Sequence, residues 1–374
     1  MPLLQQGGVE VVVRTLMEDT PDEDDLVLVS RDATTAIATS QFSGRIKAHL
    51  ELPKNRPSPS WGRGMAEWLK DQSVDLCHFH LSGTYGWWAG SWNSCPIVEV
   101  ARYGIPTVAT NHSASSFFSP TSGRFSLFSK LAAASRAWPG KARQLAAVRW
   151  EAAVSQHDLA VTLRSFSVFK SKLVKVYHSR LDSAEATSKP FSSRIILNVG
   201  TIAFIKGQDL LVEAFALNSS QFADWQLHLV GYFGENACVA RIRHLISRHH
   251  LENRVILHGP KPDPTGYYCA AEVYVQPSLV EGLGLSLQEA MFHGCACIGS
   301  DCGGIPELIS NSSVGVLFHP GDVKHLSREL ATLMNDEDKR HSLGHAARDS
   351  IIGRGMTRQT MSETYRGLYQ KALA

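Results

Sequence analysis

The sequence has no uninterrupted apolar run near the roughly 18 residues that a membrane-spanning helix needs. Its start, MPLLQQGGVEVVVRTLMEDT, lacks the basic segment, apolar core and cleavage site of a secretory signal. Its seven cysteines follow no regular spacing, which argues against a disulfide framework and favours reduced thiols. Together these absences predict a cytoplasmic protein.

The chain also lacks the composition of disordered or fibrous proteins, because 44% of its residues are apolar and only 19% are charged. A length of 374 residues predicts two domains, each large enough for its own core. Short β-rich runs alternate with helix-like stretches throughout, which is typical of α/β proteins with parallel sheets and crossover helices. The fold class expected is therefore α/β with two doubly wound, Rossmann-like parallel-sheet domains.

Twelve runs are candidate strands, six in each half of the chain. They cover residues 25–30, 45–52, 74–81, 105–112, 158–163, 173–179, 194–200, 225–231, 254–259, 273–278, 296–301 and 314–320. The polar, proline-bearing stretch DSAEATSKPFSS predicts a linker between the halves. The expected limits are an N-terminal domain at 1–182, a linker at 183–193, a C-terminal domain at 194–350 and a helix-like end at 351–374, for which packing on the N-terminal domain is one option.

The expected first strand of the N-terminal domain is not evident. A doubly wound domain normally opens with a strand that lies centrally in the sheet. Here only six residues precede GGVEVVVRTL, which predicts a glycine turn followed by the first helix. Either residues 1–5 supply a stub of that strand or the true start lies upstream, and we expect the second.

The segment VEGLGLSLQEA carries two glutamates, Glu281 and Glu289, on an otherwise apolar stretch. The surrounding sequence predicts strand, glycine loop, helix from about residue 286, strand and a second glycine loop. Free backbone N–H groups and the positive end of the helix dipole then favour an incoming anion. Glu289 can accept hydrogen bonds from a ribose diol, and Glu281 can meet the hydroxyls of a second sugar. A nucleotide sugar offers ribose, diphosphate and hexose in that order.

This block resembles the signature of the group-1 family of retaining, nucleotide-sugar-dependent glycosyltransferases. Similar elements are QGGVEVVVRTL, VDLCHFH, YGIPTVATNHS and VGTIAFIKGQDLLVEAF, so the resemblance extends over nearly the whole chain. It implies the two-domain B-type fold, with a cleft between the domains and the donor bound on the C-terminal domain. It also implies a hexosyltransferase activity in polysaccharide or glycolipid assembly.

The resemblance also implies roles for individual residues. Lys206 would bind the donor diphosphate, near the end of the strand at Gly200 and Thr201, where many members carry an arginine in place of Thr201. Glu289 would hold the ribose, and His112 would contact the hexose. Glu281 would hold the hexose together with the backbone of Gly282, Leu283, Gly284 and Leu285. Gly7 and Gly8 would close over the diphosphate.

No metal or other cofactor is expected, because Lys206 and the helix dipole would stabilise the leaving diphosphate. The segment HGCACIGSDC contains His293, Cys295, Cys297 and Cys302, but it lacks zinc-site spacing, and cysteine is a common core residue. His78 and His80 point to one face of a predicted strand, and structural packing is the favoured interpretation for both.

The stretch from His112 to Arg180 carries eleven Lys/Arg against two acids, a local balance of +9. A solvated face, a membrane surface and a nucleic-acid site are the open interpretations. Aromatic and basic residues interleave at 124–150, which favours an anionic membrane surface. Nucleic acid has no recognition motif in its support.

The function predicted is transfer of a hexose, with retention, from a nucleotide-diphosphate sugar to a saccharide or lipid-linked acceptor. Two alternatives remain. One is a nucleotide-sugar epimerase on the same fold, and the other is a truncated or degenerate relative that binds the nucleotide sugar without turnover. Thr201 and the short N-terminus support the second alternative. A cytoplasmic location, peripheral on the inner face of a membrane, fits the basic region.

Overall fold

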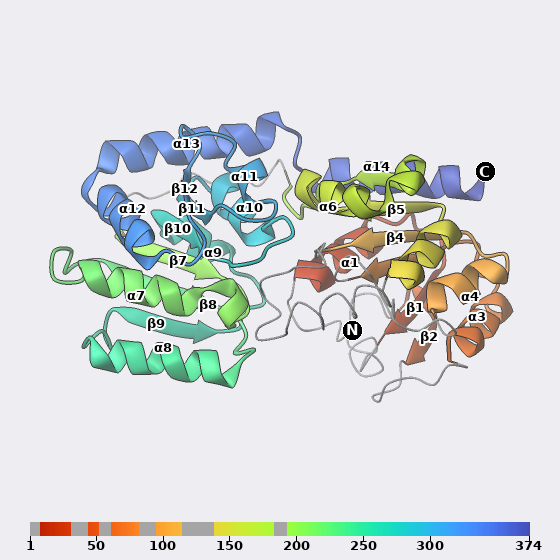
Figure 1. Cartoon of the computed structure of the whole chain (residues 1–374), viewed down its shortest axis with the longest axis horizontal. Coiled ribbons are helices and arrows are strands. Elements are labelled where there is room, and N and C mark those ends of the chain that lie inside the picture. The colour runs from red at the N-terminus through yellow and green to blue at the C-terminus, as the bar shows by residue number, and fades with distance from the viewer. Residues whose placement is uncertain (1–7, 31–43, 52–60, 82–94, 114–137, 183–192) are drawn as a thin grey trace. The chain divides into compact units, whose positions relative to one another are not determined.

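The computed structural model describes residues 8–30, 44–51, 61–81, 95–113, 138–182 and 193–374. The chain divides into two compact units. The N-terminal unit contains residues 1–180 together with 358–374, and the C-terminal unit contains residues 181–357. Both units combine helices with parallel strands (Figure 1). The predicted strand stub at 1–5 and most of the predicted linker lie outside the described residues.

The C-terminal unit is a six-stranded parallel sheet in the order β12-β11-β10-β7-β8-β9. Its strands are β7 (Ile195–Val199), β8 (Gln226–Val230), β9 (Val255–Gly259), β10 (Val273–Gln276), β11 (Ala296–Ser300) and β12 (Val316–Phe318). All six lie within the predicted ranges. The strand order reverses between β7 and β10, and in open α/β sheets ligands bind beyond the carboxyl ends of the strands at such a point.

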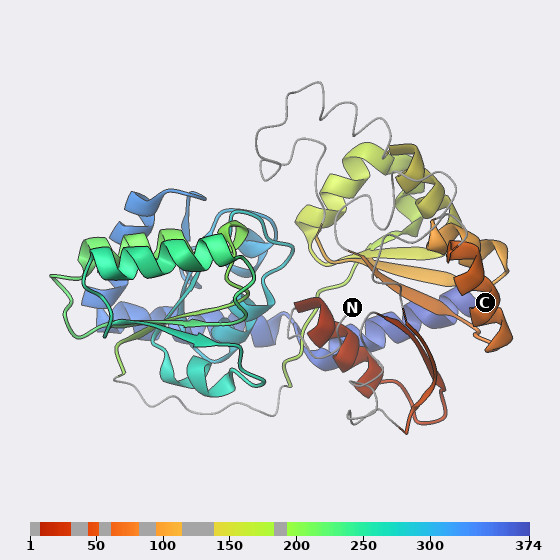
Figure 2. The ribbon, with the colours of Figure 1, turned by 90° about the horizontal axis from the view of Figure 1, so that it is seen from below.

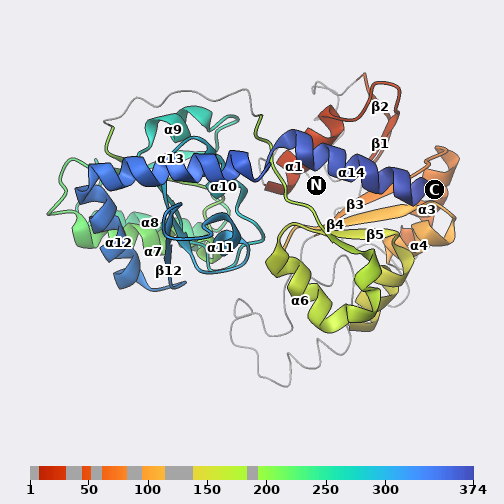
Figure 3. The ribbon, with the colours of Figure 1, turned by 90° about the horizontal axis from the view of Figure 1, so that it is seen from above.

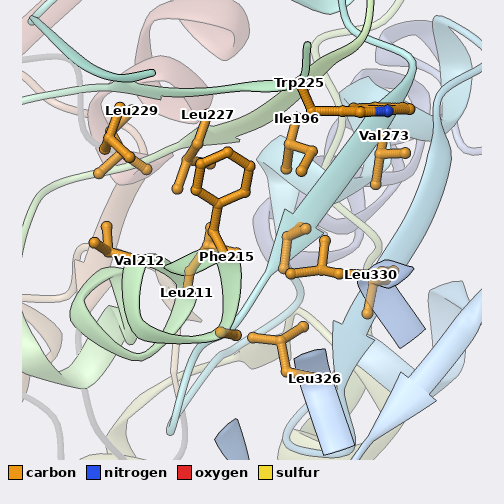
Figure 4. Close-up of a cluster of buried hydrophobic side chains, with 14 of the residues drawn as sticks. Ile196, Leu211, Val212, Phe215, Trp225, Leu227, Leu229, Val273, Leu326 and Leu330 are labelled. Carbon is orange, nitrogen blue, oxygen red and sulfur yellow. The ribbon is translucent and has the colours of Figure 1, made fainter. Parts of the chain in front are cut away.

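The helices that connect consecutive strands of this unit are η2 (Phe204–Lys206), α7 (Gln208–Asn218), α8 (Asn236–Arg248), α9 (Thr265–Ala270), α10 (Leu285–Phe292) and α11 (Ile305–Leu308). Two further helices, α12 (Val323–Asn335) and α13 (Glu337–Gly353), follow the last strand. One face of the sheet packs against α7, α8 and α12 in a single apolar cluster. Figure 4 shows Phe215 of α7 facing Ile196 and Leu227 of the sheet. This core holds β7 and β10, and the segments that follow these two strands carry Lys206 and Glu281.

The N-terminal unit contains two parallel sheets in the described residues. One has the order β1-β2 and the other β3-β4-β5-β6. The strands are β1 (Leu26–Ser30), β2 (Ile46–Glu51), β3 (Cys77–Leu81), β4 (Thr107–Asn111), β5 (Trp150–Ala153) and β6 (Leu173–Lys175). The helices are α1 (Gly8–Glu18), α3 (Trp61–Asp71), α4 (Pro96–Arg102), α6 (Gln156–Phe166), η1 (Ser167–Lys172) and α14 (Arg358–Leu373).

One predicted strand is wrong. Residues 158–163 belong to α6, where Asp158, Thr162 and Phe166 are buried at the four-residue spacing of a helix. Ser155 caps this helix by accepting a hydrogen bond from the backbone N–H of Asp158 at 3.1 Å. The strand of this region is β5, which the prediction missed because Glu151 interrupts its apolar sequence.

The last helix, α14, packs in the N-terminal unit against β4 (Figure 3). Its first turn is ion-paired to the end of α1, because Arg358 contacts Asp19 at 2.5 Å and Glu18 at 2.9 Å. Figure 2 shows α14, in blue, between the β1-β2 sheet and the larger sheet. In the part of the chain that the structure covers, no helix combines the length and apolar character needed to cross a membrane.

Candidate active site

The glutamate-pair block follows β10 at the point where the strand order of the C-terminal unit reverses. Helix α10 begins at Leu285, and Gly284 precedes it with a φ of 97°. Residues other than glycine rarely adopt this φ, so a glycine is needed where the loop turns into the helix. The backbone N–H groups of the first turn have no acceptor within the helix and favour an anion there. Glu289 lies one turn further on and is only 7% exposed.

Lys206 lies in the turn that follows β7, and its ammonium contacts Glu281. The Nζ–Oε2 distance is 2.9 Å and the Nζ–Oε1 distance is 3.1 Å. Gly207 makes this approach possible, because its φ is 68° and a Cβ there would collide with the carbonyl oxygen of Pro277. The structure therefore brings two of the predicted residues into direct contact.

Glu281 also accepts hydrogen bonds from its own loop and strand. Ser278 Oγ and Gln276 Nε2 each donate to Oε2 at 3.0 Å, and the backbone N–H of Gly282 donates to Oε1 at 3.3 Å. The second glycine loop closes against this segment, since a Cβ at Gly303 would collide with the Glu281 carbonyl oxygen. These contacts fix the Glu281 carboxylate beyond the carboxyl end of β10, where the strand order reverses between β7 and β10.

Gln208 shapes the loop that carries Gly200 and Thr201. It is fully buried at the start of α7, donates to the Thr201 carbonyl at 3.0 Å and accepts from the Ala203 N–H at 3.3 Å. The sequence prediction did not single it out, and neither did it single out Gln276 or Ser278. Among sequence signals, only their positions beside Lys206 and Glu281 could have indicated them.

His112, predicted to contact the donor hexose, belongs to a histidine cluster in the N-terminal unit. Its Nε2 atom lies 2.9 Å from Nδ1 of His80, and its ring lies 4.9 Å from that of His178. The ring of His78 lies beside that of His80, with centroids 4.2 Å apart and a tilt of 36° between the ring planes. His78 and His80 therefore pack together on one face of β3, as the sequence predicted.

Tyrosines of α14 complete this histidine cluster, defined here as His78, His80, His112 and His178. Tyr369 lies 2.7 Å from His78, and Tyr365 lies 2.8 Å from His178. Burial lowers the pKa of His80 to about 4 and that of His178 to about 3. Burial and the neighbouring imidazoles also lower the pKa of His78 and His112 well below 6.5. All four imidazoles are neutral at pH 7.

Gly8 is the first residue of α1, and Gly7 lies outside the described residues.

The seven cysteines are free thiols. His293 lies near Cys269, with 3.7 Å between Nδ1 and Sγ. Within the described ranges, no group of three or more His, Cys, Asp or Glu side chains could hold a metal ion. Asp336, in one of two Asp-Glu-Asp triplets of the sequence, caps α13 by accepting from the Lys339 N–H at 2.9 Å.

The basic region is less exposed than its sequence suggests. Lys141 is fully buried and pairs with Glu151, with Nζ–O distances of 2.6 and 2.7 Å. Lys141 belongs to the segment 124–150 that the sequence predicts as a membrane surface, and for this residue the prediction is wrong. Lys172 donates to the carbonyls at residues 145, 146 and 148, at the end of the helical segment 138–147. Residues 124–137 lie outside the described part of the chain.

Two family models match the chain in succession. The model "Glycosyltransferase Family 4" matches residues 6–178, and the model "Glycosyl transferases group 1" matches residues 180–350. The fold is thus the GT-B fold of glycosyltransferases, with two Rossmann-like domains. The chain belongs to the glycosyl transferases group 1 family, whose members are retaining enzymes that transfer a sugar from a nucleotide sugar.

Curated relatives show the same affiliation. An N-acetyl-alpha-D-glucosaminyl L-malate synthase of Bacillus anthracis is 30% identical over 182 residues, which cover 49% of this chain and 46% of that relative. A D-inositol 3-phosphate glycosyltransferase of Corynebacterium glutamicum is 25% identical over 361 residues, covering 92% of this chain and 83% of that protein. The match to the first relative therefore spans about half of its length.

Solved structures share the fold over the whole chain. A glycosyltransferase of Rickettsia africae superposes with a TM-score of 0.76 at 18% identity and covers 100% of this chain and 97% of its own. HepE of Anabaena, solved in complex with UDP, superposes with a TM-score of 0.74 at 20% identity and covers 98% of both chains. A further structure of HepE contains UDP-glucose.

Proposed function

We propose that this enzyme transfers a hexose, with retention of configuration, from a uridine diphosphate sugar to a saccharide or lipid-linked acceptor. The contact between Lys206 and Glu281 at the strand-order switch, one loop before α10, is the observation that carries this proposal. The complexes of HepE with UDP and UDP-glucose support UDP-glucose as the first donor to test.

In this proposal the donor diphosphate lies between Lys206 and the first turn of α10. A lysine ammonium carries three N–H donors, of which Glu281 accepts two, so the third is available to a phosphate oxygen. Negative charge grows on the leaving diphosphate as the glycosidic bond breaks, and Lys206 and the α10 dipole stabilise it. The sugar passes through a transition state that resembles an oxocarbenium ion. The leaving phosphate helps to remove the proton of the acceptor hydroxyl.

The remaining residues bind the donor in the same proposal. Glu289 accepts hydrogen bonds from the ribose hydroxyls, and the backbone of 282–285 contacts the phosphates. His112 contacts the donor hexose and Gly8 the diphosphate. Glu281 offers Oε1 to a hexose hydroxyl, because Oε2 accepts from three donors at 2.9–3.0 Å, whereas Oε1 accepts from Lys206 and the Gly282 N–H at the longer distances of 3.1 and 3.3 Å. Thr201 supplies backbone but no charge, so Lys206 carries most of the electrostatic stabilisation on the C-terminal unit.

The experiment that tests the donor site is a calorimetric titration of UDP against the variant Glu289→Ala. We expect more than a tenfold loss of UDP affinity, since two charge-assisted hydrogen bonds are lost. Glu252→Ala, an exposed glutamate of the same unit, is the matched control and should bind UDP as the wild type does. Equal UDP affinity in Glu289→Ala and the wild type would refute the ribose role.

Two alternative functions are tested by turnover. Conversion of the UDP-sugar into another UDP-sugar without an acceptor would favour an epimerase. Tight UDP-sugar binding with neither hydrolysis nor transfer, across saccharide and lipid-linked acceptors, would favour a binding protein without turnover. Release of UDP with an acceptor-dependent rate is the result that we expect.

A surface of the N-terminal unit supports a lipid-linked acceptor at an anionic membrane. Trp138 stacks on Phe166, with ring centroids 5.5 Å apart, and stays 43% exposed. Val168 is 79% exposed two residues beyond Phe166, and the exposed Lys170 follows it. Exposed apolar side chains beside a cation are typical of interfacial segments. We expect Val168→Asp with Lys170→Glu to abolish co-sedimentation with phosphatidylglycerol vesicles, and absence of binding by the wild type would end this part of the proposal.

A further inference from the structure

Strand β10 has one apolar face and one polar face. Val273 and Val275 lie in the apolar cluster of the C-terminal unit. Tyr274 and Gln276 alternate with them, so their side chains point to the other side of the sheet, and Ser278 continues this alternation beyond the strand. These three polar residues, named the β10 row, are between 0% and 5% exposed. Polar groups buried this deeply need hydrogen-bond partners within the protein.

The β10 row forms a chain of hydrogen bonds that ends on Glu281. Tyr274 donates its hydroxyl proton to Gln276 Oε1 at 2.7 Å. This bond fixes the orientation of the amide, so that Gln276 Nε2 donates to Ser278 Oγ at 2.8 Å and to Glu281 Oε2 at 3.0 Å. Ser278 donates in turn to the same Oε2 atom. Burial raises the pKa of Tyr274 well above 10, so its hydroxyl stays a donor at every physiological pH.

We propose that the β10 row is a positioning device for Lys206, with Gln276 as its central residue. Gln276 and Ser278 hold Oε2 of Glu281, and the Lys206 ammonium, which contacts both oxygens of this carboxylate, is thereby kept in one place. The side chain of Glu281 is 13% exposed and that of Lys206 is 31% exposed, so the pair lies at the edge of the interior. The inference rests on the proposed function, in which Lys206 binds the donor diphosphate.

The physical reason is the freedom of long side chains. A lysine side chain gives up substantial rotamer freedom when it is held in one position. Here the anchor is a carboxylate that is itself held by two uncharged donors, one at the end of strand β10 and one two residues beyond it. Without those donors the Glu281 side chain can rotate, and the ammonium that follows it loses its fixed position beside the phosphates. Binding of the β-phosphate should then weaken, while binding of the base and ribose stays.

The experiment compares a nucleoside diphosphate with its monophosphate. Wild type, Gln276→Leu and Lys206→Ala are titrated with UDP and UMP, or with GDP and GMP if the guanine pair binds the wild type more tightly. We expect Gln276→Leu to lower the diphosphate-to-monophosphate affinity ratio at least fivefold and to change the monophosphate affinity less than twofold. The KM for the UDP-sugar should rise in the same variant.

The controls separate positioning from stability. Asn218→Ala removes a buried amide that bonds Ser327 at 2.9 Å, away from β10, and should leave the ratio unchanged. Ser278→Ala removes the second donor to Oε2 and should lower the ratio as well, which keeps the test decisive if Gln276→Leu does not fold. Melting temperatures and circular dichroism identify folded variants.

The outcomes distinguish the two claims. If Lys206→Ala loses the diphosphate preference and folded Gln276→Leu and Ser278→Ala retain it, the β10 row has no positioning role and the proposed function stands. If Lys206→Ala also keeps the full preference, the role of Lys206 in the proposed function is wrong, and the positioning inference is wrong with it. A loss of the ratio in Asn218→Ala as large as in Gln276→Leu would also overturn the inference.

Discussion

The histidine cluster predicts that the N-terminal unit loses stability in mild acid. An unfolded chain protonates its histidines below pH 6.5, whereas burial keeps the cluster neutral in the folded chain down to about pH 4 for His80 and about pH 3 for His178. The unfolded state therefore binds more protons between these values, and stability falls as the pH falls. The cluster therefore does not lower the free energy of unfolding above pH 6.5, and its destabilising effect grows progressively as the pH falls below 6.5.

The size of this effect follows from the two pKa values. At pH 5, each of His80 and His178 should lower the free energy of unfolding by about 2 kcal/mol relative to pH 8. His78 and His112, whose pKa values are also lowered, act in the same direction. Because single domains are stable by only about 5–15 kcal/mol, these losses are large.

Urea titrations at pH 8 and pH 5, followed by tryptophan fluorescence, measure this loss in the relevant unit. Seven of the eight tryptophans belong to the N-terminal unit, and only Trp225 belongs to the C-terminal unit. The variant His178→Gln should show a pH-dependent loss about 2 kcal/mol smaller than that of the wild type. His157→Gln, at an exposed position, should behave as the wild type does. An equal loss in His178→Gln and the wild type would refute this account of the cluster.

Two further perturbations test other parts of the structure. Lys141→Met leaves Glu151 buried without its cation and should destabilise the N-terminal unit by about 3–5 kcal/mol, while Lys141→Met with Glu151→Leu should recover most of the loss in the same urea titration. A single variant as stable as the double variant would contradict this. Gly303→Ala places a methyl group against the Glu281 carbonyl at a φ of 56° and should reduce UDP affinity at least tenfold by calorimetry. Gly353→Ala, where a Cβ meets open space, is its control, and equal affinities would exclude the close approach.

Most of the strands could be predicted from the sequence, because buried parallel strands are short, apolar and β-branched. The failure at 158–163 has a local cause. Its Val and Thr favour a strand, but the Ser155 cap and the four-residue spacing of buried positions favour the helix that forms. Conversely, β5 includes a glutamate that is acceptable inside the protein only because Lys141, ten residues earlier, neutralises it. That pairing depends on tertiary structure, which periodicity does not contain.

The candidate site could be predicted as far as its motif extends. The glycine loop and the helix that follows it indicate Glu281 and Glu289, and the resemblance to the family indicates Lys206. The structure adds that Lys206 and Glu281 touch. Tyr274 and Gln276 could not be identified in this way. In a one-dimensional pattern, a polar residue in a strand usually indicates a solvent-facing side, whereas here both side chains are buried and bonded to each other. Their role depends on their shared face of β10 and on the loop that brings Glu281 next to Gln276.

The membership of α14 in the N-terminal unit has a consequence for synthesis on the ribosome. Residues 358–374 are made after the whole C-terminal unit, yet they contact β4 and bond Asp19 of the N-terminal unit. At typical translation rates the C-terminal unit, residues 181–357, takes roughly 10–40 s to emerge. During that interval the surface of the N-terminal unit that α14 will cover stays exposed. Chaperones and nicking proteases therefore act on an incomplete unit, and a premature stop codon leaves it incomplete.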